Sequence, residues 1–172
     1  ALRVSSATIN ANSGQVFASQ PVITVVDVSG NKVDNSVASV DVFSSAQTLS
    51  ATTTVSASSG TTTFTDLALT GTAGTYTLTF TSTGLTDATA SVVLSPGAAH
   101  HLSITASNSA ANATAFASQP VVTIYDASNN VVTGSTTLVS LSATGATIGG
   151  TYTMNAVAGV ANFTGNGVKL TG

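Results

Sequence analysis

An eleven-residue stretch that occurs twice constrains the fold of this chain more than any other feature. Phe17–Asp27 returns almost letter for letter as Phe116–Asp126, 99 positions later, and the same offset continues well beyond the stretch itself. A duplicated unit of roughly a hundred residues has the size of a small domain. The sequence therefore predicts two copies of one domain in tandem, over residues 1–96 and 97–172.

Short segments of alternating or β-branched residues, separated by turn signals, make up the first copy. Thr75–Thr81 is the clearest, because its Tyr, Leu and Phe alternate with Thr as in a half-buried strand. The predicted strands of this copy are Leu2–Ala7, Val22–Val28, Val37–Ser44, Thr52–Ala57, Thr61–Leu69, Thr75–Ser82 and Ala88–Leu94. Short strands at this spacing, without a helical period, predict an antiparallel β-sandwich.

The second copy follows the same plan over a shorter length. Its predicted strands are Leu102–Ser107, Val121–Asp126, Leu138–Ala143, Thr151–Met154 and Val160–Phe163. Leu170–Gly172 answers to Leu69–Gly71, so the last two strands of the first copy have no counterpart. A sandwich without them exposes a sheet edge and an apolar face. We expect either that the natural chain continues beyond Gly172 or that a strand from another molecule completes the second sandwich.

The repeated stretch has the residue types of a scaffold. Its signature positions are Phe17, Pro21, Asp27, Phe116, Pro120 and Asp126. Pro21 and Pro120 stand at the head of a strand, where the absent N–H breaks no ladder bond. Asp27 and Asp126 follow that strand, and an Asp carboxylate can accept hydrogen bonds from the next backbone N–H groups. We interpret the duplication as a structural signature and not as an active site.

Composition excludes several classes of partner. Charged residues make up 5% of the chain, with three Lys and Arg in all, against about 25% charged residues in ordinary soluble domains. Nucleic-acid and anionic-membrane binding both require clustered Lys and Arg, so we expect neither partner. No apolar run approaches the ~20 residues of a membrane span, so we expect no membrane insertion by this segment. The abundance of Thr and Ser and the absence of Cys and Glu favour an exported, extracellular protein.

No group of residues in the sequence has the pattern of a catalytic or metal site. His100 and His101 are the only histidines, and we interpret them as linker residues without a ligand role. Asp27 and Asp126 have too few acidic neighbours for calcium, which takes about six to eight oxygen ligands. Neither a nucleophile beside a base nor a pair of acids is recognisable. We therefore predict a protein that is not an enzyme and carries no cofactor or metal.

Two kinds of surface site remain as candidates. Asn112 and Asn162 each begin an Asn-x-Thr triplet, the acceptor pattern for N-glycosylation, and neither triplet has a counterpart in the first copy. Tyr125 and Tyr152 are the aromatic candidates for contact with a ligand, because aromatic side chains often anchor recognition surfaces.

Several motifs resemble the bacterial Ig-like repeats of the invasin/intimin group and related large surface proteins. They are the repeated stretch, Gly74–Thr79, Ala156–Phe163 and the exit Pro96–Ala99. The resemblance implies an all-β fold of tandem antiparallel Ig-like β-sandwiches, the second incomplete. It also places Tyr76 where a tyrosine corner is expected.

The same resemblance implies a function. Repeats of this kind serve as stalks of adhesins, as surface-layer subunits and as parts of cell-surface filaments. We therefore expect an extracellular structural repeat module of a large prokaryotic cell-surface protein, acting as a spacer, lattice or filament subunit. Its partners would be other copies or neighbouring repeats. The alternative is an adhesin recognition module that binds a glycan or a host protein.

Overall fold

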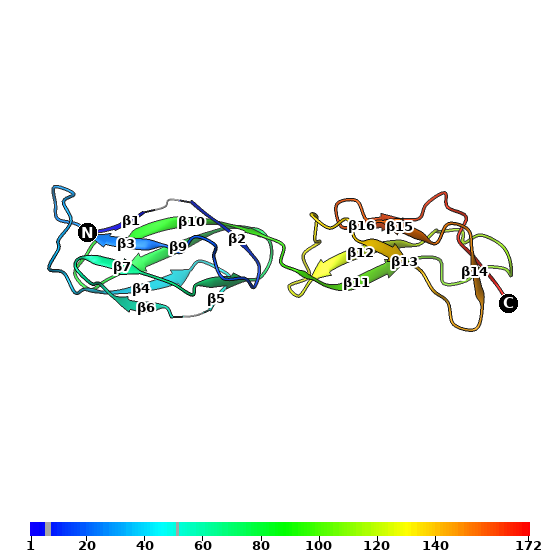
Figure 1. Ribbon diagram of the computed structural model, residues 1–172, viewed down its shortest axis with the longest axis horizontal. Helices are drawn as coiled ribbons and strands as arrows, with labels where there is room; N and C mark the ends of the chain where they lie inside the picture. Colours follow the sequence, from blue (N-terminus) through cyan, green and yellow to red (C-terminus); the bar gives the residue numbers. More distant parts are fainter. Residues whose placement is uncertain (6–7, 51) are drawn as a thin grey trace. The chain divides into compact units, whose positions relative to one another are not determined.

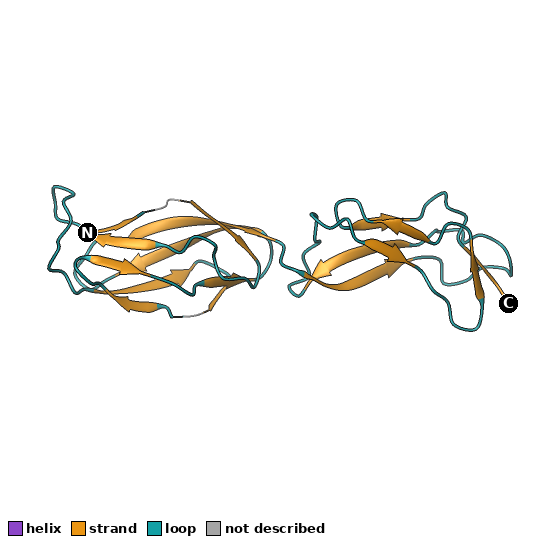
Figure 2. Cartoon of the chain, in the orientation of Figure 1, coloured by secondary structure: helices purple, strands orange, loops and turns teal. Residues whose placement is uncertain are grey.

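The computed structural model describes residues 1–5, 8–50 and 52–172 (Figure 1). Within these residues the regular structure consists of β-strands, and no helix is present (Figure 2). The chain divides into two compact units, Ala1–Gly97 and Ala98–Gly172, called unit 1 and unit 2 below. The all-β prediction is confirmed.

Unit 1 is an Ig-like sandwich of two main sheets. Its strands are β1 (Leu2–Val4), β2 (Thr8–Asn12), β3 (Val22–Val25), β4 (Ser39–Ser44), β5 (Thr48–Ser50), β6 (Thr54–Ser56), β7 (Thr61–Thr63), β8 (Ala68–Thr70), β9 (Gly74–Thr81) and β10 (Ala88–Ser95). One sheet has the order β1-β3-β7 and the other β2-β10-β9-β4-β6, while β5 and β8 form a separate pair. Neighbouring strands are antiparallel except β2 and β10, which run parallel.

One hydrophobic core joins the two main sheets of unit 1. Strand β9 faces this core with alternate residues: Leu78 and Phe80 are fully buried, whereas Thr75 and Thr77 are exposed. The ring of Phe80 lies 5.8 Å from that of Phe64, which follows β7, in a tilted arrangement. Burying a side chain of this size contributes about 1.5–3 kcal/mol, so this contact between Phe80 of β9 and the residue after β7, in the other sheet, stabilises the sandwich.

Some strand boundaries differ from those predicted. The predicted strand Thr61–Leu69 is two strands, β7 and β8, that belong to different sheets. The predicted strand Leu2–Ala7 ends as β1 at Val4, and its residues 6 and 7 lie outside the described residues. Strands β2 and β5 were not predicted. β2 contains two Asn residues, which disfavour strands, and the register with β10 holds it in place.

Unit 2 repeats part of this framework. Its strands are β11 (Ala99–Thr105), β12 (Val121–Asp126), β13 (Leu138–Ser140), β14 (Thr147–Gly149), β15 (Thr153–Asn155), β16 (Val160–Asn162) and β17 (Lys169–Thr171). The sheet β11-β12-β16 corresponds to β1-β3-β7, the pair β13-β15 to β4-β6, and the pair β14-β17 to β5-β8. Strands β9 and β10 have no counterpart in unit 2.

The segment of unit 2 that corresponds to β2 is not a strand. Residues 107–111 form no ladder, although they follow β11 as β2 follows β1. The reason is that β2 pairs with β10, and unit 2 has no strand at that place. The buried hydrophobic cluster falls from seventeen residues in unit 1 to seven in unit 2, so we expect unit 2 to be the less stable of the two.

Candidate functional site

A glutamine clamp is the most closely repeated polar feature, and the sequence did not reveal it. In unit 1, Gln20 Oε1 accepts a hydrogen bond from the Leu67 N–H (3.1 Å), and Nε2 donates to the Leu67 carbonyl (3.0 Å). In unit 2, Gln119 makes the same pair of bonds to Val168, at 2.7 and 3.2 Å. Each Nε2 also donates to the carbonyl of the signature Phe, Phe17 or Phe116. The side-chain amide therefore takes the place of a β-bridge.

A second clamp closes each unit at the end of β8 or β17. Ser13 Oγ donates to the Gly71 carbonyl and accepts from the Gly71 N–H, both at 3.1 Å. The equivalent residue of unit 2, Asn112, donates through Nδ2 to the Gly172 carbonyl (3.0 Å) and accepts from the Gly172 N–H (3.2 Å). The predicted glycosylation candidate Asn112 thus uses its amide in a backbone contact.

The signature aspartates organise the turn after β3 or β12. Asp126 is 1% exposed, and its Oδ1 accepts from the N–H groups of Ser128 and Asn130, both at 2.8 Å. Its Oδ2 accepts from Asn130 Nδ2, also at 2.8 Å. Asp27 makes the same turn in unit 1 but is exposed, with Asn31 as its main partner.

The hydrogen bonds of this turn shift the titration of Asp27. The backbone N–H of Asn31 is the largest cause, and its side-chain amide is the second; together they lower the pKa of the Asp27 carboxyl below its usual value of 3.8. The Asp27 carboxylate therefore caps the turn, as the sequence suggested, and its oxygens accept hydrogen bonds from Ser29 and Asn31.

The remaining signature residues lie in the framework. The carbonyls of Pro21 and Pro120 accept hydrogen bonds from the N–H groups of Phe64 and Phe163, at 3.2 and 3.0 Å. Phe17 is 3% exposed, and Phe116 is only partly buried. Pro21, Asp27, Pro120 and Asp126 thus lie at or near the ends of β3 and β12, and Phe17 and Phe116 lie in the segments that precede these strands.

The two histidines belong to a strand, and their interpretation as linker residues was wrong. β11 begins at Ala99 and pairs with β12, with a register shift at His100. The ring of His101 stacks on that of Tyr125 at 5.4 Å, and its Nδ1 lies 3.3 Å from that of His100. The sequence signal that could have revealed this is the alternation of Leu102 and Ile104 with Ser103 and Thr105, because a strand with this alternation can extend back over the histidines.

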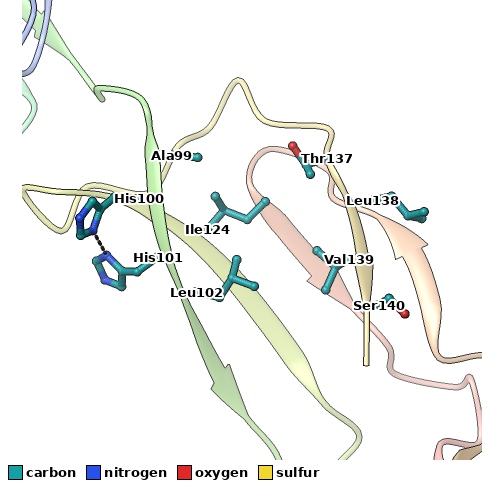
Figure 3. A pocket seen from close by; sticks show the side chains of 9 residues that line it. All are labelled: Ala99, His100, His101, Leu102, Ile124, Thr137, Leu138, Val139 and Ser140. Carbon is teal, nitrogen blue, oxygen red and sulfur yellow. Dashed lines mark hydrogen bonds between the residues drawn. The ribbon is translucent and has the colours of Figure 1, made fainter. Parts of the chain in front are cut away.

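A groove of about 250 Å³ lies beside this strand, between β11 and β13 of unit 2. Figure 3 shows the side chains that line it, among them the apolar Leu102, Ile124 and Val139 and also His100 and His101 of β11. Leu102 is 59% exposed, whereas Ile124 and Val139 are buried. Its lining combines apolar side chains with those of His100, His101, Thr137 and Ser140, and it is the candidate site that the structure adds to the sequence analysis.

The other predicted surface residues are dispersed. Asn162 is exposed at the end of β16, and its Oδ1 accepts from the Thr164 N–H (3.0 Å). Tyr152, 41% exposed, precedes β15 and does not line the groove. In the part of the chain that the structure describes, three or more His, Cys, Asp or Glu side chains nowhere gather as a metal site would require. The same residues include no helix long and apolar enough to cross a membrane.

Comparison with known proteins gives structural neighbours but no family by sequence. No family model matches the chain, and no curated protein does. The adhesin InvE of Yersinia pseudotuberculosis is 21% identical with a TM-score of 0.46, over 99% of this chain and 50% of that one. Domains 5–6 of the S-layer protein SbsC are 17% identical with a TM-score of 0.42, over 99% of this chain and 95% of that one. The D0–D1 domain of intimin is 18% identical with a TM-score of 0.40, over 99% of this chain and 83% of that one.

These neighbours are surface proteins of the kinds that the sequence resemblance named. The chain spans half the length of the adhesin structure. At these identities the likeness concerns the fold alone.

Proposed function

We propose that this chain is a structural repeat module of a large extracellular, cell-surface protein, in which it acts as a spacer, lattice or filament subunit. The observation that carries the proposal is that the duplicated polar residues form hydrogen bonds within their own unit. The glutamine clamp, the Asp turn and the Pro-headed strand recur with the same hydrogen bonds in both units. Such a pattern is typical of a module whose role is to hold its shape.

The surface differs between the units at equivalent positions. Ser39 of β4 corresponds to Leu138 of β13, and the exposed Phe43 corresponds to Ser142. A ligand site duplicated with the domain would instead keep its exposed side chains. Sheets faced with Thr and few charges can also lie side by side without repulsion, which favours assembly.

Mechanical unfolding of single molecules tests the spacer role. A chain pulled between its ends is expected to extend in two separate steps, one for each unit, and to refold when the force is released. A spacer that bears load must recover in this way. Extension without a resolved step at low force would contradict the proposal. Sedimentation over a range of concentrations distinguishes a lattice or filament subunit, which associates, from a spacer, which stays monomeric.

A recognition module is the second candidate function, and one observation favours it. The stacked rings of His101 and Tyr125 form a small aromatic surface, of the type on which ligands can pack. A screen against an array of glycans tests this function. Binding that is lost on Tyr125→Ala but retained on Tyr152→Ala would support it, and the absence of any binding would exclude glycans as ligands.

A further inference from the structure

The two histidine rings of β11 lie side by side, although consecutive side chains of a regular strand point to opposite faces of the sheet. Ala99 pairs with Asp126 and His101 with Tyr125, and His100 between them is the extra residue of a β-bulge. A bulge redirects the side chain of its extra residue. The rings of His100 and His101 therefore come together, with their centroids 5.6 Å apart.

The spacing of the two Nδ1 atoms is that of neighbouring ligands on a tetrahedral metal ion. These atoms of His100 and His101 lie 3.3 Å apart, facing each other (Figure 3). Zinc binds histidine nitrogens at about 2.0–2.1 Å in tetrahedral geometry, which places two such nitrogens about 3.3–3.4 Å apart. Square-planar geometry with bonds of the same length would place them only about 2.8–3.0 Å apart. The pair therefore matches the geometry of zinc.

The surroundings orient one ring and leave the other accessible. The ring of His101 stacks on that of Tyr125, with centroids 5.4 Å apart and an interplanar angle of 15°. His100 is exposed, and its ring is nearly perpendicular to that of His101, at 83°. A ligand that is already oriented lowers the entropy cost of binding. His101 thus provides a fixed ligand, and His100 can close on an ion from solvent.

The contact between the rings is compatible with metal binding. When both rings are neutral, one Nδ1–H donates to the other Nδ1, because a neutral imidazole carries a single proton. For an ion to bind, that proton moves to Nε2 of the same ring, which leaves both Nδ1 lone pairs free. This step is a change of tautomer, so the pair exchanges one long hydrogen bond for two bonds to the metal.

We propose that His100 and His101 form an open, two-ligand site for a divalent transition-metal ion, zinc by the spacing of the nitrogens. In the described part of the chain no third His, Cys, Asp or Glu joins them, so water or a second copy supplies the remaining ligands. The sequence predicted no metal site here, because it does not reveal the bulge that brings the rings together. Unit 1 has Ala1 and Val26 in place of His101 and Tyr125, so the site belongs to unit 2 alone.

Calorimetric titration of the whole chain with zinc chloride tests the site. The original chain is expected to bind one zinc ion per molecule. Loss of a group that only orients a metal ligand costs about 10–100-fold in affinity, so His100→Gln, which removes a ligand, should weaken binding at least about tenfold. Asp87→Asn is the matched control, because it removes an exposed carboxylate of unit 1, and it should bind zinc as the original chain does.

Nitrogen NMR of the imidazole groups identifies the ligating atoms. Zinc is expected to shift the Nδ1 resonances of both rings and to leave both Nε2 atoms protonated. Sedimentation in the presence of zinc then distinguishes the source of the other ligands. A monomer with bound zinc supports the site with water as the further ligand, and a zinc-dependent dimer that His100→Gln abolishes supports it with a second copy as the further ligand.

Four results would overturn the proposal. The first is the absence of saturable zinc binding, and the second is equal affinity in the original chain and in His100→Gln. The third is an equal loss of affinity in His100→Gln and in Asp87→Asn, which would show adventitious binding to scattered side chains. The last is coordination through Nε2, which would leave the facing Nδ1 atoms without a role.

Discussion

Leu2 and Leu102 occupy equivalent positions, opposite Val25 and Ile124 on the neighbouring strand, yet Leu2 is 6% exposed and Leu102 59% exposed. Two strands that pair with their neighbours in the same register thus have different environments. Unit 1 contains the β9–β10 hairpin, and the carbonyl of Thr86 in its turn accepts a hydrogen bond from the Leu2 N–H. Burial in a sandwich depends on the layer that covers a strand as much as on the strand itself.

The first prediction compares these two leucines. Leu2→Ala should lower the free energy of unfolding of unit 1 by about 2–5 kcal/mol, because it leaves a cavity in a packed core. Leu102→Ala should lower that of unit 2 by less than about 1 kcal/mol, because most of its side chain is already in water. Amide exchange at Ile23 and at Val122 reports on the two units separately. Equal losses would show that Leu102 is buried in solution.

The glutamine clamps give the second prediction. Gln20→Ala and Gln119→Ala should each lower the stability of their own unit by about 1–3 kcal/mol, because the backbone N–H of Leu67 or Val168 loses its hydrogen-bond partner. Gln15→Ala is the matched control, since this exposed side chain is outside the clamp. Urea denaturation, followed through amide exchange in each unit, measures the effect. A loss for Gln15→Ala as large as that for Gln20→Ala would argue against the clamp.

The acid behaviour of the Asp27 turn is the third prediction. The pKa of Asp27 is lowered in the folded chain, chiefly by the Asn31 N–H, so its contribution to stability is complete above pH 3.8, the usual pKa. The contribution is lost as the pH falls from there through the lowered pKa. Asp27→Asn should remove this part of the acid destabilisation of unit 1, which urea unfolding between pH 6 and pH 2 would detect. An identical pH profile for both chains would disprove the assignment.

The sequence predicted the elements whose residues determine their own conformation. The alternation in Thr75–Thr81 was sufficient to predict β9, and the repeat of Phe17–Asp27 was sufficient to predict that β3 and β12 are equivalent. Strand β2 could not be predicted, because its parallel pairing with β10 and not its composition holds it.

The candidate site was less accessible to sequence reasoning. The groove is lined by residues 99–102, Ile124 and residues 137–140, which are distant in sequence, so the sequence could indicate an exposed apolar face but not which residues line it. The clamp of Gln20 depends on a backbone contact 47 positions away, which no local pattern reveals. Its only signal is that Gln precedes Pro in both copies.

Two turn glycines give the fourth prediction. Gly60 and Gly159 have φ values of 71° and 79°, and an added Cβ would meet the carbonyl oxygen of Val33 or, at 2.6 Å, of Val132. Gly60→Ala and Gly159→Ala should therefore cost more than the roughly 1–2 kcal/mol of left-handed backbone strain alone. Gly30→Ala is the control, because Gly30 has φ 85° with open space around it. Thermal unfolding of the three variants should rank Gly30→Ala as the mildest, and any other order would contradict the steric argument.

Tyr76 gives the last prediction. Its Oη donates to the Thr72 carbonyl (2.7 Å) and accepts from Gln47 Nε2 (2.9 Å), so it joins the entrance of β9 to the turn before β5, as a tyrosine corner does. Tyr76→Phe should lower the stability of unit 1 by about 1–2 kcal/mol, because the Thr72 carbonyl and the Gln47 amide both lose a partner. In a double-mutant cycle with Gln47→Ala, the two losses should sum to more than the loss in the double variant, since both changes remove the same hydrogen bond. Unit 2 has no equivalent of Tyr76, so the amide exchange of Val122 should not change. Strict additivity in the cycle would show that the contact between Tyr76 and Gln47 does not contribute to stability in solution.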